Sequence, residues 1–520
     1  MPPPGVRSSQ PTFCVIKKPS KGGKNLLSSI SLTRVGRAAL LAALSTVRSW
    51  SQAPATSPAP QSGALPPKCE QVAQRPANSP RYRRDSSDED WSFLCDPVER
   101  QDPWDAIKYI ALGPESWYLS LGGELREQYE VYRNEFWGLA PETPNGYNLS
   151  RVMGHADVHF GKRFRAFAEL TSSLEFGRKG SPRPFDKNKL DVGQAFFEFN
   201  PWVPKNSEST PLSIKIGRQE LNYGDGTLIA TRDLNVRLPF DGIKLALRRQ
   251  NWRIDAFAMR PVVLGPNFFN GAPDHSQTFW GVWATHTKTN GFFRQLDLYY
   301  LGLDRKETEF QQGTGRDRRN TVGVQVHEQA RTFAFVQEGD WQFGSFASGR
   351  ILAWKFAGAI SKSVPGVRFR PTLSFKGAVS SGTHHPANGD LQTFYPLFPN
   401  GLYYGYMALT NGSANAIVAH PAINLHLSEK VSLDVETFAF WRQTINDGLY
   451  GQGGMFLFPG QISSARYIGS TQDVSAVWRP DRHITVLAIA AYYEAGKYLR
   501  ETLSPAKNIA YVSVLASYTF

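Results

Sequence analysis

The sequence predicts an all-β fold, a transmembrane antiparallel β-barrel of about 18 strands with short periplasmic turns and long extracellular loops. Three observations indicate this fold. Segments with alternating apolar and polar residues recur from residue 117 onward, the connections between them alternate between short and long, and the chain ends in the strand-like stretch YVSVLASYTF. Alternation with period two is typical of a strand with one apolar face. Short turns at one rim and long loops at the other are typical of outer-membrane barrels.

The first 53 residues differ from the rest of the chain, because they contain eight Lys or Arg residues and no Asp or Glu. An apolar run at residues 38–47 follows the basic stretch and leads into a Ser-Gln-Ala site at residues 51–53. This order predicts a cleaved secretory signal peptide, and a disordered basic tail is the alternative. Removal of the signal peptide lowers the formal net charge from +13 to +5, which weakens a nucleic-acid-binding interpretation.

The segment between the signal peptide and the first strand is polar and lacks strand periodicity. It begins with a Pro/Ala/Ser-rich linker and continues with mixed charge. Cys69 and Cys95 are a candidate disulfide pair in an oxidising periplasm, and two unpaired thiols are the alternative. The predicted domain organisation is a signal peptide at 1–53, a linker with a periplasmic pre-barrel segment at 54–113, and an outer-membrane barrel at 114–520.

The predicted strands begin at residues 117–132, where Leu121 and Leu125 alternate with Glu124 and Arg126. The same alternation predicts the other strands at 150–160, 163–174, 190–200, 211–219, 240–249, 252–261, 277–287, 292–303, 319–329, 331–343, 350–361, 367–379, 416–427, 430–442, 464–479, 482–495 and 508–520. A soluble β-sandwich or propeller is the alternative fold. Such a fold does not require a polar face on nearly every strand, so the membrane barrel is favoured.

The connections between the predicted strands support the same interpretation. Short turns are expected at residues such as 161–163 and 479–482, and long connections at residues 220–240, 304–320 and 380–415. The last of these is rich in Gly, Pro, Asn and Tyr. Because the long connections alternate with the short ones, they are expected at the extracellular rim.

The polar strand faces predict a charged lumen, because the apolar faces of a membrane barrel contact lipid. Residues 218–248 concentrate arginines in one long connection, which would form a constriction if it folds inward. Arginine suits carboxylate-bearing substrates, because its planar fork binds them bidentately. Alternatively, the charges only neutralise one another around water. The candidate pore-lining residues are Arg126, Arg151, Arg165, Arg218, Arg232, Arg237, Lys244, Arg442, Glu124, Asp157 and Glu169.

Two stretches of the sequence resemble the bacterial alginate export porin family. They are YLSLGGELREQYE at residues 118–130 and IKIGRQELNYGDGTLIATRDLNVRLPFDGIKL at residues 214–245. The resemblance extends over roughly residues 90–520 and implies an outer-membrane barrel of about 18 strands whose electropositive pore passes a polyuronate. It also implies a place on the conductance path for Arg126, Arg151, Arg218, Arg232 and Arg237.

The sequence therefore predicts an outer-membrane channel of a diderm bacterium that passes an anionic polysaccharide, an alginate-like polyuronate, through an arginine-lined pore. A general or small-anion-selective porin and a structural or adhesive barrel are the alternatives. No nucleophile elbow, zinc-ligand spacing or phosphate-binding loop occurs in a supporting context, so neither an enzyme nor a cofactor is expected. The expected partners are outer-membrane lipid, anionic polysaccharide or small anions, periplasmic export components, and the barrel assembly machinery, for which Tyr518 and Phe520 are the candidate signal.

Overall fold

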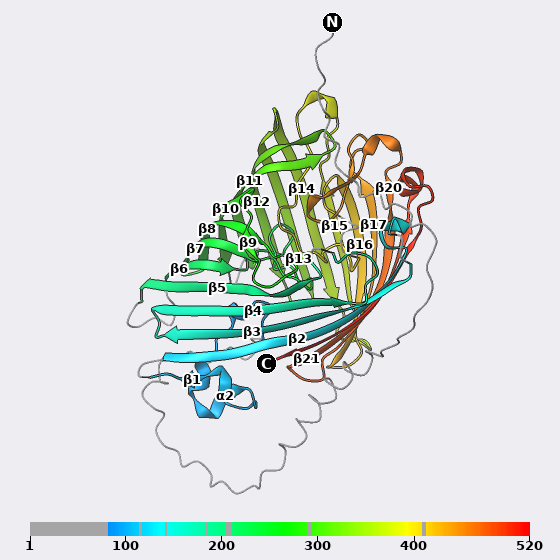
Figure 1. The fold of residues 1–520 in the computed structure, drawn as a ribbon. Coiled ribbons are helices and arrows are strands. Elements are labelled where there is room, and N and C mark those ends of the chain that lie inside the picture. Colours follow the sequence, from blue (N-terminus) through cyan, green and yellow to red (C-terminus); the bar gives the residue numbers. More distant parts are fainter. Residues whose placement is uncertain are drawn as a thin grey trace, which may run out of the picture. The chain divides into compact units, whose positions relative to one another are not determined.

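A computed structural model of the protein describes residues 82–113, 117–140, 143–183, 185–203, 211–288, 293–407 and 412–520. In this part of the chain, long strands pair with their sequence neighbours in antiparallel order. The first of them, β2 (Trp117–Arg133), also pairs with the last, β22 (Ile509–Thr519), so the sheet closes into a barrel (Figure 1). The predicted 18-strand antiparallel barrel is confirmed. The predicted signal peptide and linker lie outside the described residues.

The other barrel strands follow in sequence order around the sheet. They are β3 (Asn145–Phe160), β4 (Phe164–Phe176), β5 (Asn188–Trp202), β6 (Leu212–Gln219), β7 (Phe240–Arg249), β8 (Trp252–Val263), β10 (Gln277–Thr287), β11 (Gln295–Phe310), β12 (Gly313–Gln329), β13 (Phe333–Phe346), β14 (Gly349–Ser363), β15 (Thr372–Ser380), β16 (Ala416–His426), β17 (Val431–Arg442), β20 (Tyr467–Trp478) and β21 (Ile484–Ala495).

Short elements lie in the pre-barrel segment and in the connections. The short strands are β1 (Ile110–Ala111), β9 (Ala272–Pro273), β18 (Leu449–Tyr450) and β19 (Phe456–Phe458). The helices are α2 (Asp105–Lys108), α3 (Lys497–Thr502) and the 3₁₀ helices η2 (Ser86–Asp88), η3 (Ser92–Cys95), η4 (Pro97–Glu99), η5 (Glu135–Gly138), η6 (Pro386–Asn388), η7 (Gln452–Gly454) and η8 (Gly460–Ile462). Among the described residues, none of these helices has the length and hydrophobicity of a membrane-spanning helix.

The two faces of β2 differ as the alternation predicts. Leu125 and Tyr129 point out of the barrel and are 46% and 53% exposed, whereas Arg126 and Gln128 point inward and are buried. The paired strand β22 repeats this pattern, because its valines at 512 and 514 are exposed on the outer face. The period-two pattern therefore separates an apolar outer surface from a polar inner wall at the closing seam.

One predicted long connection is wrong. Residues 304–320 are mostly strand, because β11 continues to Phe310 and β12 begins at Gly313. On the outer face of this hairpin Arg316 pairs with Asp304, with Nη2 and Oδ2 2.6 Å apart. The charged side chains of this stretch pair across the two strands. A charged stretch does not end a β-ladder whose side chains are exposed to water.

Two other long connections fold into the lumen. The β6–β7 connection, residues 220–239, meets the β15–β16 connection, of which residues 381–407 and 412–415 are described, through a parallel bridge between Ile229 and Phe398. The amide of Ala230 donates to the carbonyl of Phe398 at 3.0 Å, and the amide of Phe398 donates to the carbonyl of Leu228 at 2.8 Å. These two inward loops support each other inside the barrel.

The inward loops are packed on one side of the lumen by apolar side chains. The lumen-facing residues of β7, β8, β10 and β11 contribute aromatic and aliphatic side chains to this cluster, although Lys244, Asp255 and Asp297 of these strands are charged and also face inward. The sequence predicted a polar inner face on nearly every strand, so the apolar cluster differs from that prediction. The cluster includes Phe240, Phe257, Phe279, Trp283, Leu301, Leu228, Ile229, Leu397 and Phe398. Because the loops bury these rings, this side of the barrel interior is a hydrophobic core and not a water-filled wall.

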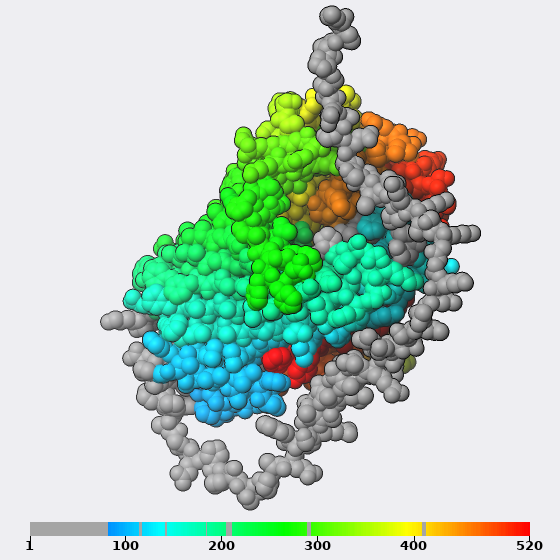
Figure 2. Space-filling view, viewed as in Figure 1, coloured from blue at the N-terminus to red at the C-terminus, as the bar shows by residue number. Residues whose placement is uncertain are grey.

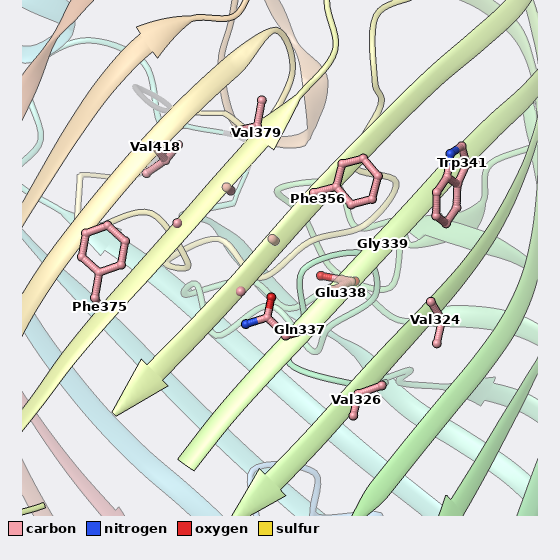
Figure 3. Close-up of a pocket in the computed structure, with 14 residues that line it drawn as sticks. Val324, Val326, Gln337, Glu338, Gly339, Trp341, Phe356, Phe375, Val379 and Val418 are labelled. Carbon is pink, nitrogen blue, oxygen red and sulfur yellow. The ribbon is translucent and has the colours of Figure 1, made fainter. Parts of the chain in front are cut away.

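A hollow of about 560 Å³ lies on the outer surface across β12 to β15. Glu338 and Asp340 of β13 bind Lys355 inside the lumen, so the residues between and beside them in the sequence point outward. Figure 3 shows the side chains of Trp341, Phe356, Phe375, Val324 and Val379 around the hollow. Gly339, Gly358 and Gly377, which have no side chain, also line it. The hollow opens away from the lumen, so it is not part of a path through the barrel.

The pre-barrel segment, residues 82–111, is anchored to the end of the last strand. The indole Nε1 of Trp104 donates to the hydroxyl of Tyr518 at 2.7 Å, and Nζ of Lys108 donates to the carbonyl of Phe520 at 2.9 Å. Figure 2 shows this segment in blue against the first barrel strands, with C-terminal residues in red beside it. Tyr518 and Phe520 are therefore covered in the folded chain, and their role in assembly stays a prediction.

Cys95 lies in the pre-barrel segment and is disulfide-bonded. Its predicted partner, Cys69, lies outside the described residues. Burial lowers the pKa of Lys108 in the same segment, while nearby Glu89 opposes this shift. Burial also raises the pKa of Glu89. These opposite pKa shifts reflect the cost of burying both charged side chains.

Replacing Leu125 by Arg should cost about 2–4 kcal/mol of unfolding free energy, because this outward position lies near the middle of β2 and is predicted to contact lipid. Unfolding in lipid bilayers, followed by tryptophan fluorescence, measures the change. Leu125→Met is the matched control and should be close to neutral. An arginine that is tolerated as well as methionine would contradict the assignment of the outer face.

Replacing Lys108 by Met should release the pre-barrel segment, because it removes the ammonium group near Glu89, 3.9 Å away, and leaves that carboxylate buried. The expected cost is about 3–5 kcal/mol, as for other buried pairs that lose one partner. Hydrogen exchange of amides 85–111 measures the release. The double variant Lys108→Met with Glu89→Gln should recover part of the protection, and equal exchange in both variants would exclude the pair as an anchor.

Candidate functional site

The β6–β7 inward loop carries the predicted arginine-rich stretch, and β2 and β3 hold it in the lumen. Nη1 of Arg126 donates to Oδ1 of Asp233 at 3.0 Å. Arg151 donates to the same oxygen at 3.0 Å and to the carbonyl of Leu234 at 2.8 Å. The loop therefore folds inward, and Arg126 and Arg151 act as its anchors.

The charges of these anchors are largely compensated. Arg151 also contacts Oε1 of Glu124 at 2.7 Å, so two carboxylates share its guanidinium group. Although enclosure acts to raise the pKa of Asp233, the guanidinium groups of Arg151 and Arg126 hold it well below its usual range. An ion-pair network of this kind keeps a loop in place but offers little free positive charge to a ligand.

Arg218 and Arg237 lie at the two ends of the same loop. Arg218 binds Asp241 at 2.8 Å and donates to the carbonyl of Val192 at 3.1 Å. Arg237 donates to the carbonyl of Arg84 in the pre-barrel segment at 2.8 Å. Both arginines therefore fasten the loop to its neighbours, and Arg237 also links it to the segment that precedes the barrel.

Two adjoining cavities lie in the remaining part of the lumen. The wider cavity, about 820 Å³, opens at the end of the barrel where β20 and β21 are joined by a short turn, and we refer to it as the vestibule. The narrower cavity, about 80 Å³, lies between the inward loops and β2, β3, β21 and β22, and we refer to it as the constriction. Asp233 lines both cavities, so they adjoin.

The constriction has one charged wall and one apolar wall. Arg126, Asp233 and Asn235 lie on the first, and Leu487, Tyr511 and Leu515 on the second. Tyr406 of the β15–β16 inward loop also reaches this cavity, and its hydroxyl forms a hydrogen bond of 3.0 Å with Ser475. The narrowest part of the path is therefore formed by segments that are distant in the sequence.

Several predicted residues lie beneath the pre-barrel segment. Arg165 binds Asp157 through two nitrogens, at 2.8 and 2.9 Å, and donates to the carbonyl of Ser87 at 2.7 Å. Glu169 accepts a hydrogen bond of 2.8 Å from Ser86. The pre-barrel segment thus occupies lumen space that the sequence assigned to an open pore.

Two predicted arginines have opposite environments. Arg442 is fully buried, and its donors bind carbonyls of its own loop at residues 445, 447, 460, 463 and 465. Arg232 has no hydrogen bond or ion pair with any residue that the structure describes, and it lies beside Gly453 at the inner face of the β17–β20 connection. Arg442 therefore organises a loop, whereas Arg232 lacks a carboxylate partner among the described residues and lines neither the vestibule nor the constriction.

Lys244 is a second basic residue without an ion pair among the described residues, although its charge acts on Glu198 and Asp255. It lies opposite Lys215 in the register of β6 and β7. Lys215 was not among the predicted site residues, although it stands on the same face, and its ammonium lies 4.0 Å from the ring centre of Phe196. The pair places two lysines on one wall of the lumen.

Sequence reasoning missed the basic residues of the vestibule. Arg83 and Arg84 belong to a segment without strand pattern, and Arg479 and Arg482 belong to a stretch identified only as a short turn. The dipeptide Arg83-Arg84 and the turn sequence RPDR were visible as local basic clusters. Nothing in the sequence indicates that these two clusters meet.

Comparison with solved structures supports the fold. The chain is similar to Pseudomonas aeruginosa OccK9 (OpdG), with a TM-score of 0.54 and 11% identity, and to a BenF-like porin from Pseudomonas fluorescens Pf-5, with a TM-score of 0.52 and 8% identity. It is also similar to P. aeruginosa OccK2 (OpdF) in complex with glucuronate, with a TM-score of 0.50 and 11% identity. Each alignment covers 77% of this chain and 98% of the other. A search of curated proteins finds no match.

Family comparison identifies the barrel itself. The sequence profile described as alginate export matches residues 117–513, from the first residue of β2 into β22. This range contains the barrel strands from β2 to β21, the start of β22 and both inward loops, and it leaves out the pre-barrel segment. The protein therefore belongs to the alginate export family and is a porin-like β-barrel of the outer membrane of a Gram-negative bacterium.

Proposed function

We propose that the protein is a non-enzymatic channel that passes an alginate-like polyuronate across the outer membrane. The observation that carries this proposal is the path that narrows from the vestibule to the constriction along a loop rich in guanidinium groups. Family membership supports a polysaccharide substrate, and the basic groups along the path support an anionic one. The channel would act by electrostatic attraction and size, since conduction requires binding that is weak enough to permit release.

The chemistry of the path suits carboxylates that repeat along a polymer. Arg232 and Lys244 line neither cavity, but they form no ion pair within the described residues, so their charges would attract a passing carboxylate at longer range. A guanidinium–carboxylate contact that water screens contributes only about 0.2–1 kcal/mol. A polyuronate can exchange one such contact for the next, because its charges are spaced along one chain.

The solved structure of OccK2 with glucuronate supports a uronate substrate in general terms. Glucuronate is a monomeric uronate, and the barrel that holds it has a fold similar to this one. The sequence identity of 11% is too low to transfer individual residues. The likeness therefore supports the chemical class of the ligand and not its binding geometry.

A channel for small organic anions is the second candidate, and the size of the constriction favours it. A cavity of about 80 Å³ leaves little room for a sugar unit unless the inward loops move. Bilayer conductance separates the two candidates. A polyuronate channel should be blocked by oligouronates more strongly than by neutral oligosaccharides of equal length, whereas a small-anion channel should pass glucuronate and show no length-dependent block.

Replacing Arg232 by Gln should weaken oligouronate block by up to about fivefold, because the variant loses a charge that no carboxylate compensates. Single-channel recordings measure block and anion-over-cation selectivity. Arg316→Gln, an exposed arginine near the β11–β12 turn, is the matched control and should leave both unchanged. Block that is unaffected by Arg232→Gln would remove this residue from the path.

Replacing Arg151 by Gln should instead loosen the β6–β7 inward loop, because Glu124 and Asp233 lose their shared partner. Loss of one member of a buried ion-pair network costs about 3–5 kcal/mol. Hydrogen exchange of amides 228–236 should increase, and the mean conductance should change. If the loop stays protected while selectivity changes, Arg151 contacts the ligand and is not an anchor.

A further inference from the structure

The vestibule is built from five parts of the chain that meet only in the folded protein, and two of them are Glu124 of β2 and Thr519 of β22. Residues 82–84 and Gln101 come from the pre-barrel segment, Asp233 and Arg237 from the β6–β7 inward loop, and residues 479–485 from the β20–β21 turn and the start of β21. The family profile begins at residue 117, so the contribution of the pre-barrel segment is not a feature of the matched barrel. The cavity encloses about 820 Å³.

The carboxylates that line the vestibule are already occupied. Glu124 binds Arg151, and Asp233 binds Arg126 and Arg151. Oδ1 of Asp481 accepts hydrogen bonds from the backbone amides of residues 483 and 484, at 2.8 and 2.9 Å. None of these three carboxylates forms an ion pair with Arg83, Arg84, Arg479 or Arg482 within the described residues.

The basic groups of the vestibule are more numerous and less engaged. The side chains of Arg83, Arg84 and Arg479 make no hydrogen bond or ion pair with the described part of the chain. Arg482 lies 3.6 Å from Asp102 and is exposed. His483 also lines the cavity, with Nε2 2.7 Å from Oδ2 of Asp102. The vestibule thus presents several arginines from two separate segments to one water-filled space.

The position of the vestibule assigns it to the periplasmic mouth. It lies at the end of the barrel that carries the short β20–β21 turn and the final strand residue Thr519. The long β6–β7, β15–β16 and β17–β20 connections lie at the opposite end, and long loops lie on the extracellular side of outer-membrane barrels. The adjoining constriction shares Asp233 with it, so a ligand in the vestibule is next to the narrowest part of the path.

We propose that the vestibule is a docking site for a carboxylate-bearing polysaccharide that arrives from the periplasm, with Arg83, Arg84, Arg479 and Arg482 as its recognition residues. This inference rests on the proposed function and adds to it a loading side and a role for the pre-barrel segment. Each exposed arginine contributes only a weak contact, because water screens its charge. Four contacts on a single polymer chain add through effective concentration, which permits capture without permanent retention.

Single-channel recordings of the full mature chain, with a blocking oligosaccharide added to one side of the membrane at a time, test this inference. Ser348→Cys, in the exposed β13–β14 turn, reports channel orientation through its reaction with a membrane-impermeant thiol reagent. A defined oligomannuronate is added to one side at a time, and a neutral maltooligosaccharide of equal length is the reference. In the parent channel, block by the oligomannuronate should be stronger from the side of the short turns.

The quadruple variant R83Q/R84Q/R479Q/R482Q should lose about tenfold or more of the block from the short-turn side, and block from the long-loop side should stay unchanged. These arginines are exposed, so the variant should assemble, and heat-modifiable mobility verifies that it does. The matched variant R316Q/R318Q/R350Q removes exposed arginines near the opposite rim and should keep the parent block from the short-turn side.

Two results would overturn different conclusions. If the quadruple variant is blocked from the short-turn side as strongly as the parent, the vestibule is not the docking site, although the channel still recognises polyuronates. If the oligomannuronate blocks the parent channel no more strongly than the neutral sugar does, from either side, the proposed function is wrong. The docking-site proposal is then wrong as well, because it rests on that function.

Discussion

The structure depends on one constraint, which is that every backbone polar group within the bilayer needs a partner. Hydrocarbon provides none, and each unpaired group costs several kcal/mol. The pairing of β2 with β22 meets this requirement by removing the two sheet edges. At the lower end of that seam, Gly123 and Phe520 exchange backbone hydrogen bonds of 2.9 and 3.0 Å. Closure leaves a wide lumen, and the remaining features of the protein determine how that lumen is filled.

The lumen is filled unevenly. Toward β7, β8, β10 and β11, the inward loops pack on aromatic rings, and their burial stabilises the loops without directional bonds. Toward β2 and β3, the β6–β7 inward loop is held by Arg126 and Arg151 through ion pairs and hydrogen bonds. Water-accessible space remains on the charged side, so the candidate path follows β2, β21 and β22. The same loops that stabilise the interior therefore also determine where a substrate can pass.

Local patterns predicted the strands well where apolar and polar residues alternate cleanly. The predicted limits of residues 240–249 and 277–287 coincide with β7 and β10. The prediction failed at residues 304–320, because their charged side chains pair with one another across the β11–β12 hairpin. The arginine list identified the residue type correctly, but it did not separate the residues by role. Arg232 and Arg442 look alike in the sequence, yet one is unpaired among the described residues and the other is enclosed by carbonyls.

The sequence by itself determined the barrel, the approximate number of strands, the direction of each strand face and the concentration of basic residues in one long connection. These properties depend on neighbouring residues, because period-two alternation and turn composition are local. Only the tertiary structure decided which arginines are anchors and which are free, since their partners are remote in the chain. Arg126 and Asp233 are separated by 107 residues, and Trp104 and Tyr518 by 414. The vestibule has the same origin: its two arginine clusters meet because closure of the barrel brings the last strands beside the first, where the pre-barrel segment is anchored.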